Sequence, residues 1–153
     1  MGQRLAAELA TEAKINGLVK TAQTAQQLET QGIEPLVMDL DRPLPDPSCG
    51  WRQIYYFAPP PGQGTGDSRM AHFLQMLGGE KQGIRLLYLG TTGVYGDCQG
   101  AWVDENHPAD PKADRALRRH DAEQQLRRWR SKTGNQVIFL RVAGIYGPDR
   151  LPL

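Results

Sequence analysis

Three short apolar runs constrain the fold of this chain more than any other feature of its sequence. They cover residues 53–58 (QIYYFA), 84–89 (IRLLYL) and 137–142 (VIFLRV), and segments of helical length or pattern lie between them. Strands that are almost uninterrupted in apolar residues are typical of parallel sheets, because helices bury both of their faces. The pattern therefore predicts an α/β fold with a doubly wound parallel sheet.

Periodicity and end signals predict the other elements. An apolar stripe of helical period opens the chain, Thr24 with Gln27 fits a capping box, and Gly134 fits a helix end. Prolines and glycines make 43–50 and 59–66 surface loops. In chain order we expect a helix at 3–13, a strand at 14–19, a helix at 24–31, strands at 35–40 and 53–58, a helix from Asp67 or Ser68 to Leu77, a strand at 84–89, a helix from about Lys112 to Lys132, and a strand at 137–142.

Composition excludes several classes of protein. The 153 residues suit one domain, which we place over 1–153, and the net charge of +1 gives no overall field that would attract nucleic acid or an anionic membrane. No apolar run approaches the roughly 18 residues of a membrane span, so we expect a cytoplasmic protein. Cys49 and Cys98 are the only cysteines and do not form a C-x-x-C motif, so neither a disulfide framework nor a zinc site is expected.

Chemistry is expected in the loops that follow the apolar strands. In doubly wound sheets, ligands bind beyond the carboxyl ends of the strands. The loops there read APPPGQG, GTTGVYGD and AGIYGPDR, and two of them carry a Tyr-Gly step after a turn of small residues. Glycine lets the backbone approach a ligand closely, and threonine and tyrosine hydroxyls supply polar contacts. The alternative interpretation, ordinary tight turns, stays open.

Longer motifs carry a family resemblance. The stretch LYLGTTGVYGDCQGAWVDENHPADP, the pair Ala122-Glu123 and the stretch FLRVAGIYGPDR resemble the NAD-dependent epimerase/dehydratase family, the extended short-chain dehydrogenases/reductases. Within it the chain looks most like an atypical branch of sugar-nucleotide epimerase-like proteins. The resemblance implies a Rossmann-type fold from which the first strand and the C-terminal substrate region are missing. It also implies an NAD(P)-dependent reaction on a sugar nucleotide or a similar carbonyl or hydroxyl substrate.

The resemblance also implies a set of cofactor-binding residues. Gly2 stands where the family has the last glycine of its G-x-x-G-x-x-G loop, and the first two glycines are absent. Lys20 follows the second strand of the family fold, where a basic residue can meet an adenosine 2′-phosphate, and Asp39 falls near the adenine. Ala58 and Pro59 match the segment that packs on the cofactor. The cofactor is therefore NAD or NADP, with a weak preference for NADP.

The catalytic residues depart from the family pattern. Thr91 takes the position of the catalytic Ser/Thr, whereas the tyrosine and lysine of Y-x-x-x-K are replaced by Arg115 and Arg119. A guanidinium stays protonated and cannot shuttle a proton near neutral pH. Arg119 can still hold the ribose or a phosphate, and Arg115 either clamps an anionic group of the substrate or is a solvated helix residue. Tyr95, four residues after Thr91, is the hypothetical proton donor.

Two alternatives to an active enzyme stay open, a non-catalytic NAD(P)-binding module and an inactive truncated fragment. The expected partner is a small-molecule nucleotide cofactor, with a homodimer as an open alternative and no nucleic acid or membrane partner. The cluster of acidic residues and His107 at 104–110 is expected to be solvated and to bind no metal. The basic residues of the helix at 112–132 are expected to form a solvated face.

Overall fold

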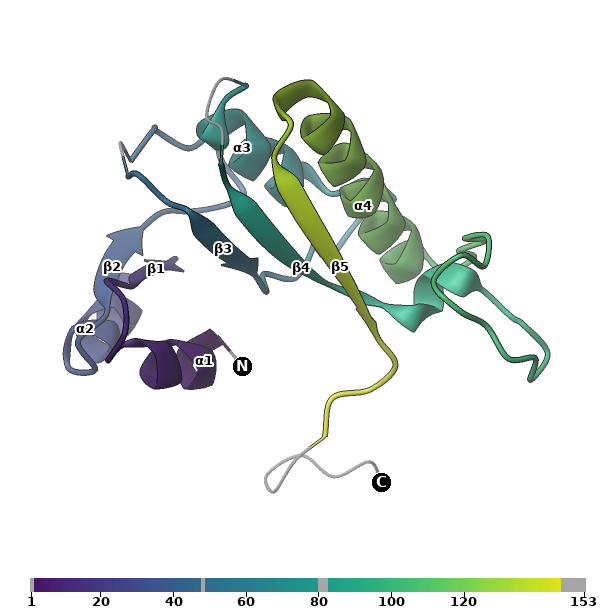
Figure 1. The fold of residues 1–153 in the computed structure, drawn as a ribbon, viewed down its shortest axis with the longest axis horizontal. Coiled ribbons are helices and arrows are strands. Elements are labelled where there is room, and N and C mark those ends of the chain that lie inside the picture. Colours follow the sequence, from purple (N-terminus) through teal and green to yellow (C-terminus); the bar gives the residue numbers. More distant parts are fainter. Residues whose placement is uncertain (1, 48, 80–82, 147–153) are drawn as a thin grey trace.

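Helices and strands alternate along most of the chain, as the sequence predicts, and the strands at 34–37 and 53–56 follow each other directly (Figure 1). A computed structural model describes residues 2–47, 49–79 and 83–146. The elements are α1 (Gly2–Leu9), β1 (Asn16–Val19), α2 (Ala22–Glu29), β2 (Glu34–Val37), β3 (Gln53–Tyr56), α3 (Ser68–Leu77), β4 (Arg85–Thr91), the 3-10 helix η1 (Thr92–Tyr95), α4 (Asp114–Thr133) and β5 (Gln136–Val142).

The strands form two parallel sheets. One sheet pairs β1 with β2, and the other has the order β3-β4-β5 with β4 in the middle. Figure 1 shows β1 and β3 as the neighbouring edges of the two sheets. The predicted Rossmann-type α/β fold is confirmed, and the sheet divides at the place where the predicted fold lacks its first strand.

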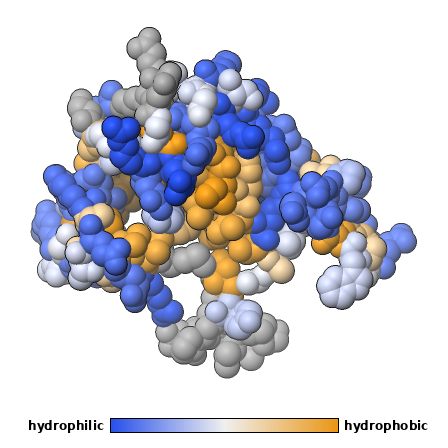
Figure 2. Space-filling view, in the orientation of Figure 1, coloured by the Kyte–Doolittle hydropathy of each residue, from blue (hydrophilic) through white to orange (hydrophobic). Residues whose placement is uncertain are grey.

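The core lies between the larger sheet and the helices α3 and α4. Leu86 and Tyr88 of β4 have no exposed surface, and Met70 of α3 and Leu126 of α4 pack into the same cluster. Successive side chains of a strand point to opposite faces, so other residues of the same strands face away from these helices. Two of them, Ile138 and Leu140, are 42% exposed, and apolar surface is visible on this side in Figure 2.

Local hydrogen bonds set the ends of the helices. Asp67 caps α3 by accepting a bond from the N–H of Met70 (3.0 Å). Gly134 ends α4 in the left-handed conformation, with φ of 71°. The prediction that Thr24 caps α2 is wrong, because the side chain of Thr21 accepts the N–H of Thr24 and the helix begins at Ala22. None of the helices in the described ranges is long and apolar enough to cross a bilayer.

Candidate active site

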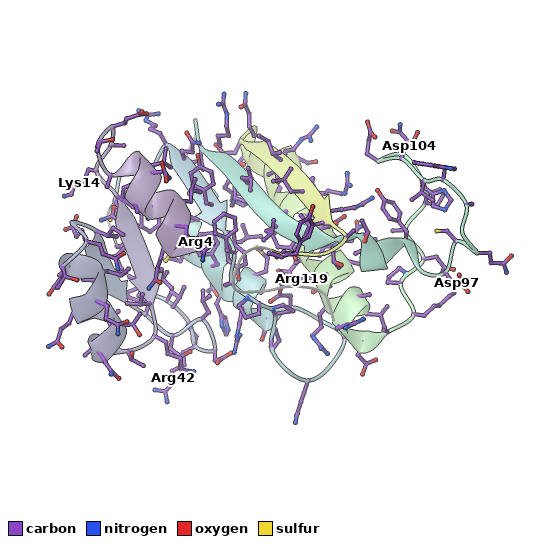
Figure 3. All side chains as sticks on the ribbon, turned by 90° about the horizontal axis from the view of Figure 1, so that it is seen from below. Arg4, Lys14, Arg42, Asp97, Asp104 and Arg119 are labelled. Carbon is purple, nitrogen blue, oxygen red and sulfur yellow. The ribbon has the colours of Figure 1, made fainter. Side chains whose placement is uncertain are left out.

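Arg119 joins the ends of two neighbouring strands. Its Nη1 donates hydrogen bonds to the backbone oxygens of Ala58 (3.3 Å), beyond β3, and of Leu89 (3.2 Å), in β4. Because β3 and β4 are paired in parallel, the turns that carry Ala58 and Thr91 lie at the same edge of the sheet. Figure 3 shows Arg119 at this edge. We call Ala58, Leu89, Thr91 and Arg119 the shelf.

The same guanidinium also contacts Tyr88. Arg119 Nη1 lies 3.4 Å from the phenol oxygen of Tyr88, and its guanidinium carbon lies 5.9 Å from the ring centroid. Burial raises the pKa of Tyr88 to about 12, so the phenol keeps its proton at neutral pH. Arg119 is half-buried, whereas Arg115, one turn earlier in α4, is exposed. Of the two arginines, only Arg119 is built into the shelf.

Thr91 and Tyr95 flank the short helix η1. Thr91 caps η1, and its Oγ1 accepts the N–H of Gly93 (3.1 Å), which leaves the hydroxyl proton available to donate. Tyr95 is only 7% exposed. Its ring lies 4.8 Å from the guanidinium carbon of Arg141 and 5.8 Å from the ring of His107. The phenol ring is therefore part of the packing of this loop.

A buried ion pair supports the loop from within. Glu123 has no exposed surface, and Arg141 donates to both of its carboxylate oxygens, at 3.0 and 2.6 Å. The bonds to Glu123 are the main cause that holds the pKa of Arg141 above its usual value. A Cβ at Gly90 would lie 3.4 Å from Glu123 Oε1, so glycine lets this carboxylate approach β4. The sequence analysis missed the pair, although Arg141 is the one charged residue in an otherwise apolar strand.

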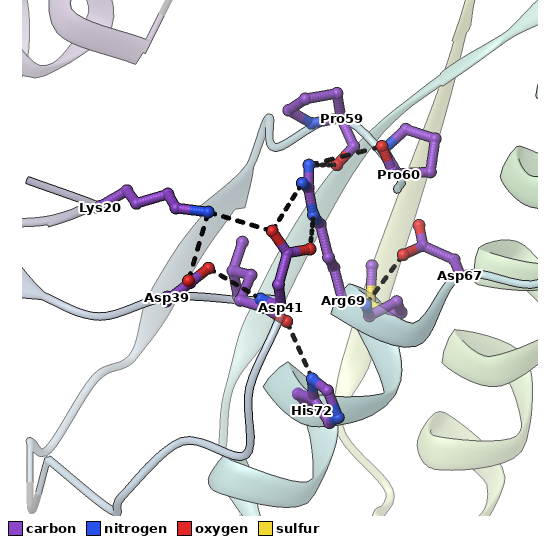
Figure 4. A network of polar contacts seen from close by, with 10 residues as sticks. Lys20, Asp39, Asp41, Pro59, Pro60, Asp67, Arg69 and His72 are labelled. Atoms are coloured by element: carbon purple, nitrogen blue, oxygen red, sulfur yellow. Dashed lines mark hydrogen bonds and ion pairs between the residues drawn. The ribbon is translucent and has the colours of Figure 1, made fainter. Parts of the chain in front are cut away.

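Lys20 is paired with two carboxylates at the end of β1 (Figure 4). Its Nζ lies 3.2 Å from Asp39 Oδ2 and 3.2 Å from Asp41 Oδ2. Hydrogen bonds to Asp41, then to Asp39, hold the pKa of Lys20 above its usual value. Asp39 is oriented in turn, because its Oδ1 accepts the N–H of Asp41 (3.0 Å). Lys20, which the resemblance places where it can meet an adenosine 2′-phosphate, is therefore already paired with two carboxylates.

Arg69 completes this network from α3. Its Nε and Nη2 donate to the two oxygens of Asp41, at 2.6 and 3.0 Å, and its Nη1 donates to the oxygen of Pro59 (3.1 Å). Hydrogen bonds from Arg69 and then Lys20 lower the pKa of Asp41 to about 2. The formal charges of Lys20, Arg69, Asp39 and Asp41 sum to zero. The network links the loop after β2 to the loop after β3.

Asp67 is a buried carboxyl group beneath the loop after β3. It is 1% exposed, and neither its Oδ2 nor the hydroxyl of Tyr56 has a hydrogen-bond partner within the described part of the chain. Burial is the main cause that raises the pKa of Asp67. Its N–H donates to Asp121 Oδ2 (2.7 Å), and Gln125 donates to its backbone oxygen (2.9 Å). These bonds tie the end of the loop to α4.

Gly2 lies beside the end of β3. A Cβ at Gly2 would be 3.4 Å from Cδ2 of Phe57, the residue before Ala58. The first residue of α1 therefore lies near the shelf, although no hydrogen bond of Gly2 to it is observed in the described residues. Of the predicted site residues, the structure brings Ala58 together with Arg119 and places Gly2 near them. Lys20, Asp39 and Pro59 belong to the neighbouring Arg69 network.

Comparison with protein families identifies the chain. The model of the NAD dependent epimerase/dehydratase family matches residues 65–152, more than half of the sequence. The chain belongs to this family. The match covers α3, β4, α4 and β5, and therefore includes Thr91, Tyr95, Arg115 and Arg119.

Solved structures of similar fold are longer than this family member. A functionally unknown conserved protein from Silicibacter pomeroyi DSS is 32% identical, with a TM-score of 0.77 over 97% of this chain and 50% of that chain. A UDP-galactose 4-epimerase is 16% identical, with a TM-score of 0.79 over 98% and 54%. The dTDP-glucose 4,6-dehydratase of Bacillus anthracis str. Ames, solved with NAD, is 14% identical, with a TM-score of 0.70 over 95% and 51%.

The chain thus spans about half the length of the solved structures that it matches. The two enzymes named above share less than a fifth of their residues with it and show the fold alone. The comparison with curated proteins found no match. Across the described ranges, no group of three or more His, Cys, Asp or Glu residues is arranged to hold a metal ion.

Asp67→Asn tests the buried carboxyl group. Because the pKa of Asp67 is raised in the folded state, the folded protein binds this proton more tightly than the unfolded chain. The contribution of Asp67 to stability is thus greatest below its unfolded pKa, near 4, and falls as the pH rises through the folded value. Asparagine also caps a helix but does not titrate. We expect the free energy of unfolding of the wild type, minus that of Asp67→Asn, to decrease as the pH rises from about 4.

Urea unfolding at a series of pH values measures this difference. Asp97→Asn is the matched control, because Asp97 also accepts a backbone N–H, from Gln99, but lies in the loop after η1. A difference that is independent of pH for Asp67→Asn would show that the pKa of Asp67 is the same in the folded and unfolded protein, and would contradict the raised pKa.

Proposed function

We propose that this chain binds a nicotinamide dinucleotide at the shelf and forms the cofactor-binding part of an enzyme of the epimerase/dehydratase type. The substrate class we propose is a sugar nucleotide or a similar compound with a hydroxyl or carbonyl group. The observation that carries the proposal is the bridge from Arg119 to the backbone oxygens of Ala58 and Leu89. It fixes two strand ends at the edge where dinucleotides bind to doubly wound sheets.

The residues present suit such a cofactor. The amino end of α1 at Gly2 provides backbone N–H groups for the pyrophosphate, which helix N-termini favour. Ala58 and Pro59 would pack against the cofactor, and Arg119 would hold the ribose or a phosphate with its remaining N–H groups. The cofactor, when bound, supplies the acceptor or donor of a hydride.

Thr91 and Tyr95 are the proposed catalytic residues. Thr91 keeps its hydroxyl proton for a substrate oxygen, since its own oxygen already accepts the N–H of Gly93. Tyr95 supplies the phenol that the helix lacks, because Arg115 and Arg119 stand at the tyrosine and lysine positions of the family. Exposed Arg115 is proposed to contact an anionic group of the substrate.

A non-catalytic dinucleotide-binding module is the second candidate. The observation that favours it is the burial of Tyr95, whose ring is packed between Arg141 and His107. A guanidinium at position 115 or 119 cannot replace a phenol in proton transfer. In this case the shelf binds the cofactor and no turnover follows.

Replacing Arg119 with alanine tests the binding site. We expect the dissociation constant for NADH to rise about 10- to 100-fold, because a charged hydrogen bond to the cofactor is worth about 1.5–3 kcal/mol. The measurement is a titration followed by NADH fluorescence. Arg128→Ala is the matched control, since Arg128 is an exposed arginine of the same helix. Equal affinities of the two variants would contradict the site.

The charges around Lys20 favour NAD over NADP within this proposal. Asp39 and Asp41 already neutralise Lys20, and Arg69 is held by Asp41. A 2′-phosphate near Lys20 would face both carboxylates, and like charges repel. The position of Lys20 in the sequence, taken alone, gave a weak preference for NADP.

Asp41→Asn is expected to shift the preference toward NADPH. Removing one carboxylate takes away a repulsion worth about 1 kcal/mol at 4 Å in water, so we expect the affinity for NADPH relative to NADH to rise about fivefold. Parallel fluorescence titrations with the two cofactors give the ratio. Glu105→Gln removes the same charge from an exposed position in the loop after η1 and should leave the ratio unchanged. An unchanged ratio in Asp41→Asn would place the adenosine elsewhere.

Turnover distinguishes the two candidate functions. For an enzyme, Tyr95→Phe is expected to lower the rate of hydride transfer by about 100-fold or more while the affinity for NADH stays the same. The assay follows NADH absorbance with a panel of sugar nucleotides and simple carbonyl compounds. Binding of NADH without turnover in the wild type would select the non-catalytic module.

A further inference from the structure

The loop between η1 and α4 is closed at its base by contacts of Gly96 and Asp110. The N–H of Asp110 bonds to the backbone oxygen of Val94 (2.9 Å). Gly96 has a positive φ of 75°, and a Cβ there would collide with the backbone oxygen of Asp110. Figure 3 shows Asp97 and Asp104 on this loop, at one end of the molecule. The loop is therefore held in a defined shape where it joins the rest of the protein.

Two turns inside this loop bring a thiol and an imidazole together. The first turn has a bond from the N–H of Ala101 to the oxygen of Cys98 (2.9 Å). The second has a bond from the N–H of His107 to the oxygen of Asp104 (3.2 Å). As a result, Sγ of Cys98 lies 3.8 Å from Nε2 of His107, which is hydrogen-bond distance for sulfur. The two residues are nine positions apart, so no local motif announces the pair.

The imidazole is placed to take the proton of the thiol. The sulfur of Cys98 lies 3.8 Å from the backbone oxygen of Tyr95 as well, but of the two acceptors only the imidazole can take up a proton. A thiolate attacks electrophiles and a thiol does not, so a base within hydrogen-bond reach makes a cysteine more reactive. The ring of Tyr95 packs edge-on against His107, with centroids 5.8 Å apart, and supports the imidazole.

Small molecules can reach the pair. Cys98 is half-buried, and His107 is exposed. Beside the imidazole is a hollow of about 450 Å³, which Trp102, Val103, Asp104 and His107 line. Trp102 is fully exposed, and the carboxylate of Asp104 favours the positive charge that the imidazole gains with the proton. A small compound therefore has room next to the base.

Cys49 provides a comparison within the same chain. It is also half-buried, but its Sγ donates to the backbone oxygen of Pro47 (3.4 Å), which cannot take up a proton. Lys14 interacts electrostatically with Cys49, yet its ammonium group is paired with Glu34 (2.8 Å). The main difference between the two thiols is thus the group that accepts the S–H.

We propose that Cys98 is a reactive thiol that forms mixed disulfides with small disulfide compounds, with His107 as its base. Nε2 of His107 takes the thiol proton as the sulfur of Cys98 attacks the compound. A bond forms from this sulfur to one sulfur of the compound, whose own S–S bond breaks. The leaving thiolate then takes the proton from the imidazolium. Cys98 is oxidised, one half of the compound is reduced to a thiol, and no further oxidant is needed. This reaction does not depend on dinucleotide binding and goes beyond the proposed function.

The probe is dithiodipyridine, a small uncharged disulfide. The intact 153-residue chain is treated with it near neutral pH and quenched with acid, and mass spectrometry of peptides gives the rate of mixed-disulfide formation at each cysteine. The rates are also measured in urea, and each folded rate is divided by the unfolded one. This ratio removes the effect of sequence neighbours such as Asp97, whose negative charge adjoins Cys98 in both states.

We expect the ratio for Cys98 to exceed that for Cys49 about tenfold or more, because a positioned base assists only Cys98. His107→Gln keeps a hydrogen-bonding side chain that cannot take up a proton, and it is expected to lower the ratio for Cys98 about tenfold while that for Cys49 stays the same. His120→Gln, on α4, is the matched control and should change neither ratio.

Three results would overturn the proposal. They are a wild-type ratio for Cys98 that is no higher than that for Cys49, a ratio for Cys98 that His107→Gln leaves unchanged, and equal lowering by His107→Gln and His120→Gln. The comparison of the two thiols uses the wild type, so it decides the question even if His107→Gln fails to fold.

Discussion

The guanidinium of Arg119 is the interaction on which the candidate site depends. The backbone oxygens of Ala58, which follows β3, and of Leu89, near the end of β4, both accept hydrogen bonds from one nitrogen of Arg119. It also lies against Tyr88, whose protonated phenol is buried in the core. A side chain on α4 thereby fixes the ends of β3 and β4 relative to each other. Any ligand at this edge meets a surface that is already ordered, and this lowers the entropy cost of binding.

Several acidic side chains near this edge form ion pairs with basic ones. Arg141 satisfies the buried carboxylate of Glu123, and Arg69 with Lys20 satisfies Asp41. Removing one partner of a buried ion pair lowers the free energy of unfolding by about 3–5 kcal/mol. The pair of Arg141 and Glu123 therefore holds α4 on β5 more firmly than an exposed pair can. The exposed network around Asp41 orders the loops after β2 and β3 relative to each other, and it adds little to the free energy of unfolding. Electrostatics here therefore positions loops.

Sequence reasoning predicted the order of elements well and the site only in part. The strands at 84–89 and 137–142 and the cap at Asp67 were predictable, because apolar runs and capping residues act locally. The end of α1 at Leu9, four residues before the predicted one, and the cap at Thr21 depend on where the chain turns toward β1 and were missed. The pairing of Lys20 with Asp41 and of Arg141 with Glu123 joins residues 21 and 18 positions apart. Such contacts follow from the packing of whole elements and leave no local pattern.

The division of the sheet links the fold to the site. The family fold orders its strands so that ligands bind where the connections diverge to the two sides of the sheet. In this chain a cavity lies between β1 on one side and β3 on the other, and Gly2 and Ala58 both line it. The residues that we propose to bind the cofactor therefore border the division of the sheet.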